Sequence, residues 1–274
     1  MFKIITKERI KFMKKRIGKV ITLVLCLALT MTMFTACGSK KEDKEEGKGE
    51  DKKQYVIATD TAFAPFEFTN DKNEFVGIDV EILAAIAEDQ GFTYKLDALG
   101  FDAALAAVQT GAADGVIAGM SITDKRKETF DFSQAYYDAD VTMAVAEGST
   151  IAKLEDLKDK KVAIKTGTNG ADYAKSIADK YGFTVVEFKD SPTMYQDVVL
   201  GNTVACFEDY PVMAYSIKQG AKMQIPEGMT SAGSSYGFAV AKGKNAELLK
   251  MFDKGLENIK KNGKFQEIVD KYTK

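Results

Sequence analysis

The sequence predicts an α/β protein made of two lobes that are joined by two crossover segments. Short apolar strands alternate with amphipathic helices from residue 55 onward, and this alternation breaks near Val141 and then restarts. Polar or glycine-rich turns follow strands in both halves. Alternating strands and helices favour mostly parallel sheets, which bind ligands beyond the carboxyl ends of their strands. Two α/β units that face each other across a cleft therefore explain the pattern better than one long sheet.

The first α/β unit begins at residue 55. Strands are expected at 55–59, 93–96 and 115–118, where short apolar runs are bounded by turn residues. A helix is expected from Gly77, because its apolar residues form one stripe, and another over 102–109. Thr123 is a predicted N-cap for a third helix.

The second unit repeats this alternation and is followed by a different ending. Strands are expected at 141–145, 161–165, 184–188, 204–207 and 236–240, and helices at 154–157, from 171, at 193–200, from 211, at 246–262 and at 265–272. The candidate crossovers are residues 135–140 and 232–237. Lobe 1 is accordingly predicted to contain residues 54–138 and 236–274, and lobe 2 to contain residues 139–235.

Composition removes several classes of function. The chain has 274 residues, is 45% hydrophobic, and carries a formal net charge of −2. This near-neutral balance lacks the basic character of nucleic-acid-binding proteins. The chain contains no histidine, so the commonest general base and zinc ligand are missing. The cysteines form no paired framework, and no calcium-loop spacing is present. No metal and no cofactor are therefore expected.

The N-terminal segment has the pattern of a secretory signal peptide. Basic residues precede an apolar run and then small residues before Cys37. Thr35-Ala36-Cys37-Gly38 resembles the lipobox of bacterial lipoproteins, although Phe34 replaces the usual leucine. We expect a signal peptide at 1–36 and lipidation of Cys37; an uncleaved anchor over 17–34 is the alternative. Residues 37–53 are nearly all charged or glycine, which predicts a disordered tether.

Polar and aromatic side chains that follow the ends of strands form the candidate ligand site. Arg126 lies in the first turn after a strand, where its planar fork suits a carboxylate beside free backbone N–H groups; an ordinary strand–helix junction is an equally good explanation of that stretch alone. Phe63 and Phe101 both follow strands and could sandwich a small side chain. Thr168 begins a helix after a glycine-rich turn, and Asp209 repeats the position of Asp60.

These segments resemble the signature blocks of the polar amino-acid-binding proteins of ABC importers. The matching blocks are 60–68, 76–81, 119–126, 165–168 and 208–211, in the same order and at similar spacing. The resemblance covers residues 54–274. It is strongest to the glutamine binders, because of Ala118-Gly119, Lys165 and the loop 61–68 with its three phenylalanines, which we call the phenylalanine loop. It implies a periplasmic-binding-protein type II fold, with the ligand held in the cleft between the lobes.

The resemblance also implies a role for each site residue. Arg126 would hold the α-carboxylate, with help from the hydroxyls of Ser121 and Thr168. Asp209 and the Gly119 carbonyl would hold the α-ammonium. Around the ligand side chain, Phe63 and Phe101 would flank it, Asp60 would accept a hydrogen bond from it, and Lys165 would close the far wall. Glu208 replaces a histidine and Asn169 a glycine, so both are included as ligand residues together with Ala118.

The expected function is capture of a free polar amino acid, with glutamine ranked first and a basic amino acid or cystine as alternatives. The expected partner is an ABC permease, and the chain is expected to be a monomer anchored by lipid at the extracellular face of the bacterial cytoplasmic membrane. If Lys165 pairs with Asp60 or Glu208, one carboxylate remains for the ligand. An enzyme resembling the cyclohexadienyl dehydratases, with Glu208 as its acid, is a further alternative on the same fold. A tethered sensor is disfavoured because the chain lacks a cytoplasmic output domain.

Overall fold

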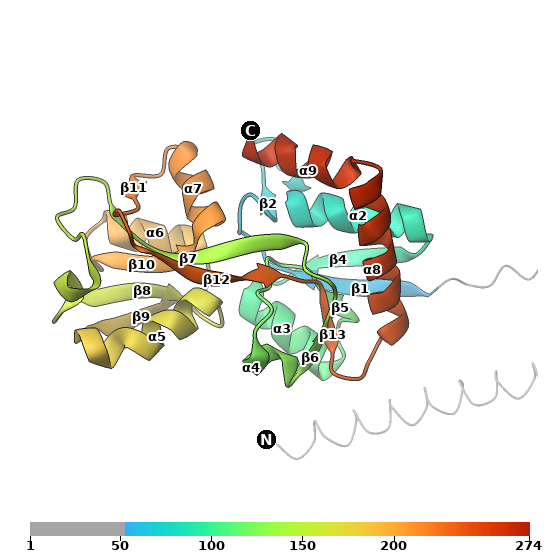
Figure 1. The fold of residues 1–274 in the computed structure, drawn as a ribbon, viewed down its shortest axis with the longest axis horizontal. Coiled ribbons are helices and arrows are strands. Elements are labelled where there is room, and N and C mark those ends of the chain that lie inside the picture. The colour runs from blue at the N-terminus through green and yellow to red at the C-terminus, as the bar shows by residue number, and fades with distance from the viewer. Residues whose placement is uncertain (1–52) are drawn as a thin grey trace, which may run out of the picture. The chain divides into compact units, whose positions relative to one another are not determined.

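The computed structural model describes residues 53–274, which form the two predicted lobes (Figure 1). Lobe 1 contains a five-stranded sheet in the order β4-β1-β5-β13-β6. Its strands are β1 (Gln54–Thr59), β4 (Thr93–Ala98), β5 (Gly115–Val116), β6 (Phe130–Phe132) and β13 (Ala239–Ala241). Strands β4, β1 and β5 are parallel, whereas β13 is antiparallel to both β5 and β6. A small hairpin, β2 (Phe68–Thr69) with β3 (Phe75–Val76), lies outside this sheet.

Helices pack on both faces of the lobe 1 sheet. One apolar core contains residues of α2 (Ile78–Gln90), α8 (Ala246–Lys261) and α9 (Lys264–Thr273), and the other contains residues of α3 (Phe101–Thr110). The predicted stripe of α2 is buried at Ile78, Ile82, Leu83, Ile86 and Ala87. Phe66 is buried, whereas Phe68 is only partly buried and lies near the rings of Tyr215 and Tyr272.

Lobe 2 contains a second mixed sheet, in the order β11-β7-β10-β8-β9. Its strands are β7 (Tyr137–Ala146), β8 (Lys161–Lys165), β9 (Thr184–Phe188), β10 (Ala205–Asp209) and β11 (Met223–Gln224). Helix α5 (Asn169–Tyr181) packs on one face, while α6 (Ser191–Val199) and α7 (Tyr210–Lys218) pack on the other. The predicted helix at 154–157 is a single 3₁₀ turn, η1 (Leu154–Leu157).

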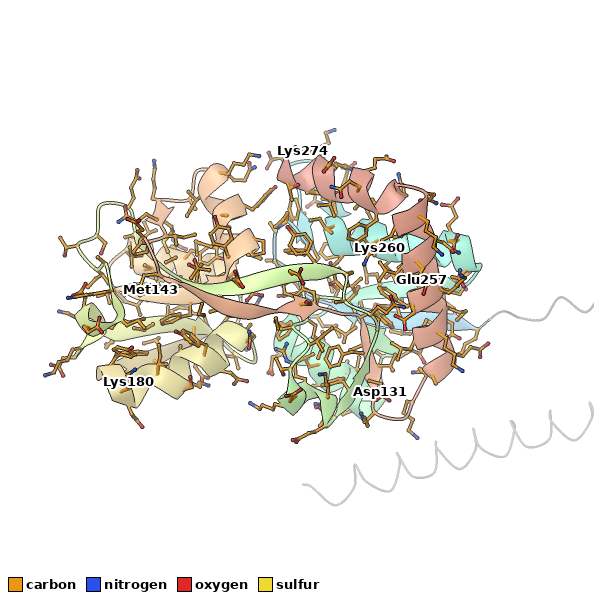
Figure 2. All side chains as sticks on the ribbon, in the orientation of Figure 1. Asp131, Met143, Lys180, Glu257, Lys260 and Lys274 are labelled. Atoms are coloured by element: carbon orange, nitrogen blue, oxygen red, sulfur yellow. The ribbon has the colours of Figure 1, made fainter. Side chains whose placement is uncertain are left out.

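The lobes are joined by two antiparallel strands that run side by side, β7 and β12 (Thr230–Tyr236) (Figure 1). Tyr137 pairs with Tyr236 where the two strands leave lobe 1. Helix α8 anchors the chain just before β7: Glu257 accepts a hydrogen bond from Gln134, and Lys260 donates to the carbonyl of Ala135 (Figure 2). These contacts connect α8 to the chain where the first crossover leaves lobe 1.

The prediction of one strand over 236–240 is wrong. Tyr236 ends β12, whereas Ala239 begins β13 in the other sheet. Gly237 lies at this change of partner, and a Cβ atom there would come within 2.9 Å of the Ile122 side chain. An unbroken strand pattern cannot reveal such a split, because each half is apolar enough to pair with a different sheet.

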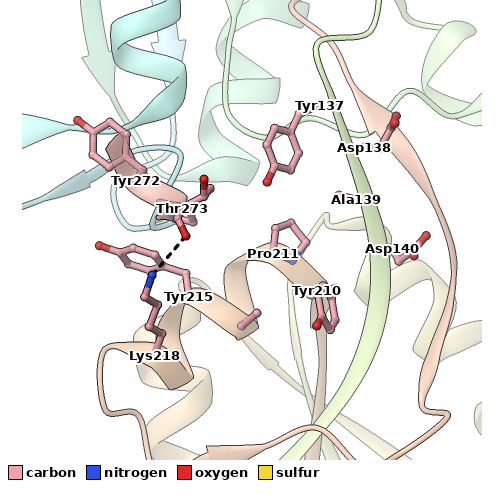
Figure 3. Close-up of a pocket in the computed structure, with 12 residues that line it drawn as sticks. Tyr137, Asp138, Ala139, Asp140, Tyr210, Pro211, Tyr215, Lys218, Tyr272 and Thr273 are labelled. Carbon is pink, nitrogen blue, oxygen red and sulfur yellow. Dashed lines mark hydrogen bonds between the residues drawn. The ribbon is translucent and has the colours of Figure 1, made fainter. Parts of the chain in front are cut away.

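The lobes also meet beside the crossovers, between α7 and α9. Lys218 of α7 donates to the carbonyls of Thr273 and Lys274 at 3.2 and 3.0 Å. A cavity of about 360 Å³ lies next to this contact. Figure 3 shows Tyr137, Tyr215 and Tyr272 around the cavity. None of the residues that line it belongs to the predicted ligand site.

The predictions for the N-terminus concern residues outside the described part of the chain. These are the signal peptide at 1–36, the lipidated Cys37 and all of the tether at 37–53 except its last residue. That residue, Lys53, forms an exposed ion pair with Asp114 at 2.8 Å. Within residues 53–274, none of the helices combines the length and the apolar character needed to span a bilayer.

Candidate ligand-binding site

The predicted site residues lie at the facing ends of the two lobes. Lobe 1 contributes the residues that follow its strands, and lobe 2 contributes the carboxyl ends of β8 and β10 with the start of α5. Polar contacts that span the cleft include those of Lys165 with Asp60, Arg126 with the Gly167 carbonyl, and Lys125 with Asp172. The structure therefore brings together residues that are about 40 to 105 positions apart in the sequence.

Arg126 is positioned by a short helix, α4 (Asp124–Lys127). Thr123 caps this helix as predicted, because its side chain accepts a hydrogen bond from the Arg126 backbone N–H. The helix has only four residues because the aromatic segment that follows enters β6. The guanidinium donates to two carbonyls, of Ser121 at 2.8 Å and Gly167 at 3.0 Å, and its carbon lies 5.3 Å from the centre of the Phe101 ring.

Arg126 carries a charge that no neighbouring carboxylate neutralises directly. Among residues 53–274, no acidic side chain forms an ion pair with it. Burial lowers the pKa of the guanidinium, and the negative charges of Asp209 and Asp172 oppose that shift. An arginine satisfied only by carbonyls can exchange those weak partners for a ligand carboxylate, which forms stronger charge-assisted hydrogen bonds.

Asp209 is the buried anion of the same region. It ends β10, and its side chain accepts a hydrogen bond from the Tyr236 hydroxyl at 2.5 Å. Burial raises the pKa of the Asp209 carboxyl to about 7, and the nearby negative charge of Glu208 contributes to the rise. A carboxylate that is costly to ionise and has one neutral donor is stabilised when an ammonium group arrives.

The other end of the cleft contains a closed ion pair. The Lys165 ammonium binds the Asp60 carboxylate across the lobes, and both side chains are only 1% exposed. The Lys165 nitrogen also lies 4.4 Å from the centre of the Phe63 ring and 5.8 Å from that of Phe101. Phe63 and Phe101 are both buried beside this ion pair, and their role in flanking a ligand side chain stays a prediction. Here the protein neutralises its own charges.

Glu208 is directed toward α6 and already holds three hydrogen bonds. One oxygen accepts from Ser191 at 2.7 Å and from Tyr195 at 2.9 Å, and the other accepts from the Asp209 backbone N–H at 3.0 Å. Since Lys165 pairs with Asp60, Glu208 is the acid that the sequence left for the ligand. Both oxygens of Glu208 already accept hydrogen bonds within the protein, and its role as a ligand-binding residue stays a prediction.

The remaining predicted residues shape the backbone around the cleft. Gly119 has a φ of +53°, and a Cβ atom there would meet the Phe63 ring at 2.5 Å, so glycine is required. Thr168 caps α5 through its hydroxyl, which also donates to the Lys165 carbonyl at 2.8 Å. Asn169 is the first residue of α5, two positions before the predicted start. Ala118 and Ser121 are buried beside Gly119, and the ligand roles of all these residues stay predictions.

Several residues at the site had no role in the sequence prediction. Tyr236 holds Asp209, Ser191 and Tyr195 hold Glu208, and the carbonyl of Gly167 holds Arg126. Asp79 accepts a hydrogen bond from the Gly119 backbone N–H at 2.7 Å. Asp79 and Gly167 carried a signal, since both lie in blocks that resemble a known family. The other contacts depend on the pairing of distant elements.

Comparison with known proteins places the chain among extracellular binding proteins. Residues 55–274 match the family described as bacterial extracellular solute-binding proteins, family 3. The arginine-binding extracellular protein ArtP of Bacillus subtilis is 29% identical over 91% of this chain and 96% of its own. Substrate-binding domain 2 of GlnP from Lactococcus lactis, solved in an open conformation, is 46% identical over 81% of this chain and 96% of its own, with a TM-score of 0.57.

Ancestral arginine-binding proteins are less identical but superpose better. One bound to arginine is 34% identical, with a TM-score of 0.75, and covers 81% of this chain and 98% of its own. One bound to glutamine is 36% identical, with a TM-score of 0.74, and covers 80% and 97%. A rotation between lobes lowers the overall superposition without changing sequence identity. The open domain and the ancestral proteins thus differ in how well their whole chains superpose on this one.

Proposed function

The chain belongs to family 3 of the bacterial extracellular solute-binding proteins, and from this premise we propose that it captures one free amino acid between its lobes and delivers it to an ABC importer. The observation that carries the proposal is the separation of Arg126 from Asp209. Each is buried or partly buried in the cleft, and within the described part of the chain its hydrogen-bond partners are all neutral. The α-carboxylate and α-ammonium of an amino acid supply the two opposite charges that these side chains lack.

Glutamine is the proposed ligand. The Lys165–Asp60 pair presents a donor and an acceptor side by side and has no net charge. A carboxamide can accept from the ammonium and donate to the carboxylate at once. A guanidinium would meet the positive charge of Lys165, and a side-chain carboxylate would meet that of Asp60, at close range in a buried cleft.

A basic amino acid is the second candidate, because ArtP and the ancestral relatives are described as arginine-binding. In this chain a guanidinium could reach Asp60 only if Lys165 moved away. The named relatives are described as binding proteins or substrate-binding domains, which favours a binder over the dehydratase alternative.

A thermal-shift screen of the purified domain tests both candidates. The ligands are glutamine, glutamate, arginine, lysine, histidine and cystine, each in large excess. A ligand present at a thousandfold its Kd stabilises the folded state by about 4 kcal/mol, which is a clear rise in Tm. We expect the largest rise with glutamine. A larger rise with arginine would favour the second candidate, and no rise with any of the six would refute amino-acid binding.

We further propose that Cys37 carries a lipid that holds the mature protein at the outer face of the cytoplasmic membrane. The support is the basic–apolar–small pattern that ends at this cysteine. Expression of a Cys37→Ala variant should leave an uncleaved precursor that incorporates no labelled palmitate. Equal labelling of the variant and the parent chain would contradict the assignment.

A further inference from the structure

Behind the predicted ammonium subsite, two acidic side chains are buried in contact with each other. Glu67 lies in the phenylalanine loop and Asp79 in the first turn of α2, and both are 0% exposed. One oxygen of Asp79 accepts hydrogen bonds from the Gly119 backbone N–H at 2.7 Å and from the Tyr136 hydroxyl at 2.8 Å. Asp79 thus connects a site residue to the residue that precedes the first crossover strand.

The other three oxygens of these two carboxyl groups are buried and, in the part of the chain that the structure describes, lack a hydrogen-bond donor to stabilise a negative charge. Within residues 53–274, neither Glu67 oxygen nor the second Asp79 oxygen has a donor partner of its own. The two carboxyl groups instead lie within hydrogen-bonding range of each other. Two adjacent carboxylates cannot both be ionised in a buried site, whereas one proton between them satisfies both.

We propose that Glu67 and Asp79 share one proton, and that this carboxyl pair positions the ammonium end of the ligand site through Gly119 and the first crossover strand through Tyr136. The proton resides on Glu67, which donates to Asp79. Asp79 is then the ionised acceptor for both the Gly119 N–H and the Tyr136 hydroxyl. The role of Gly119 in holding a ligand ammonium rests on the function proposed above.

The surroundings of the pair keep the proton in place. Burial raises the pKa of Glu67 well above its usual value, and the negative charges of Asp79 and Asp60 raise it further. Lys165, from β8 of the opposite lobe, acts in the other direction but is already bound to Asp60. Burial also raises the pKa of Asp79 to about 6, against the effect of its donors Gly119 and Tyr136. These are the titratable and charged groups that act on the pair.

The pair can position the site because its neighbours have little freedom. Gly119 is fixed in a left-handed conformation against the Phe63 ring. The loop that carries Glu67 is tied to Phe63 by backbone hydrogen bonds at 2.7 and 3.2 Å. Turning Asp79 would therefore move the Gly119 peptide and the Tyr136 anchor together. Peptide orientation decides where the Gly119 carbonyl points.

The dependence of stability on pH tests the shared proton without any ligand. The folded chain holds a proton that Glu67 releases on unfolding, since the ordinary pKa of a glutamate is about 4.3. The wild-type unfolding constant should therefore rise, relative to that of Glu67→Gln, by about tenfold for each pH unit between pH 5.5 and 7.5. Glutamine keeps an N–H donor toward Asp79. Titrations of groups that do not contact the pair, such as Asp209, are common to both chains and cancel in the ratio; Asp79 contacts Glu67, so its own titration near pH 6 adds to the ratio at the acid end of this range.

Glu88→Gln, on the exposed face of α2, is the matched control and should give a constant ratio. A ratio for Glu67→Gln that stays within threefold over this range would overturn the shared proton. The infrared spectrum supplies an independent readout. At pH 7 and in an Asp209→Asn background, which removes the other carboxyl group with a pKa near 7, the chain should show a carbonyl band of a protonated carboxylic acid that is lost when Glu67→Gln is added. An unchanged band would equally contradict the proposal.

The positioning role is tested by the Gly119 amide resonance and by glutamine affinity at pH 7. Glu67→Gln should leave the amide proton shift in place and the Kd within threefold. Asp79→Ala should move the resonance upfield and weaken binding at least tenfold; if it does not fold, Asp79→Asn replaces it with at least a threefold loss. An unmoved resonance with unchanged affinity would refute the role. Failure of the wild type to bind glutamine would refute only the proposed function, because the stability and spectroscopic tests use no ligand.

Discussion

Two parts of the cleft differ in whether their charged side chains are paired within the protein. At one end, among residues 53–274, the Arg126 side chain donates only to carbonyls, and the Asp209 side chain accepts only from a tyrosine hydroxyl and is costly to ionise. At the other end, Lys165 and Asp60 are bound to each other and are almost completely buried. The first end needs charges from outside the protein, whereas the second has already neutralised its own.

This difference separates the recognition of amino acids as a class from the selection of one particular side chain. The α-carboxylate and α-ammonium occur in every amino acid, so the end with unpaired charges can recognise the class. A closed ion pair offers hydrogen bonds without net charge, so it selects among side chains by discriminating against charged ones. Four predictions test this division, in order of decreasing expected effect.

Arg126→Ala should nearly abolish amino-acid binding. It removes the predicted cationic partner of the ligand carboxylate and leaves that charge buried without a counter-charge, at a cost of about 3–5 kcal/mol. This corresponds to a loss of about two to three orders of magnitude in affinity by calorimetry. Lys127→Ala, an exposed position on the same short helix, is the control and should bind normally. A loss below tenfold would place the carboxylate clamp elsewhere.

Lys165→Met should shift preference from glutamine toward arginine. The variant removes the internal cation and leaves Asp60 available for a ligand cation. Hydrogen bonds to a charged group are worth about 1.5–3 kcal/mol, so the ratio of arginine to glutamine affinity should rise about 10- to 100-fold. Lys161→Met, an exposed position on the same strand, should leave the ratio unchanged. An unchanged ratio in Lys165→Met would mean that the ion pair does not select the side chain.

Affinity should fall as the pH drops below about 7. Asp209, with its pKa raised to about 7, must lose its proton to hold an ammonium, so Kd should rise by up to about tenfold between pH 7 and 6. The raised pKa of Asp209 also affects stability, with the opposite dependence on pH. It favours the folded state at low pH, and this contribution to the free energy of unfolding is lost as the pH rises from about 4 to 7. Calorimetry should show the pH dependence of Kd, and Asp209→Asn should flatten it. A wild-type Kd that stays constant from pH 8 to 5.5 would argue against this subsite.

Loss of the exposed interlobe ion pair should have the smallest effect. Lys125 and Asp172 lie 3.0 Å apart across the cleft mouth, with side chains 76% and 51% exposed. Such pairs contribute about 0–1 kcal/mol and are screened by salt. Lys125→Ala should therefore weaken glutamine binding by at most about fivefold in calorimetry at low salt, with no difference in 1 M NaCl. Lys175→Ala breaks a similar pair with Glu187 inside lobe 2 and should not change Kd. An effect of Lys125→Ala that survives high salt would point to a direct ligand contact.

Local features of the fold followed from the sequence. Thr123 and Thr168 cap helices where predicted or within two residues, because an N-cap depends only on the next few residues. The apolar stripe of α2 and the break near Val141 predicted the layers and the two lobes. The family-like blocks pointed to the residues that gather at the cleft. All of these signals lie within short stretches of chain.

The partners of the charged side chains were decided only by the tertiary structure. Lys165 could have paired with Asp60 or Glu208, and the folded chain pairs it with Asp60 from the other lobe while α6 holds Glu208. Tyr236 reaches Asp209 only because one predicted strand is divided between two sheets. Charge is a property of each residue, but the choice among nearby partners depends on which elements pack together, and short-range sequence patterns do not specify that packing.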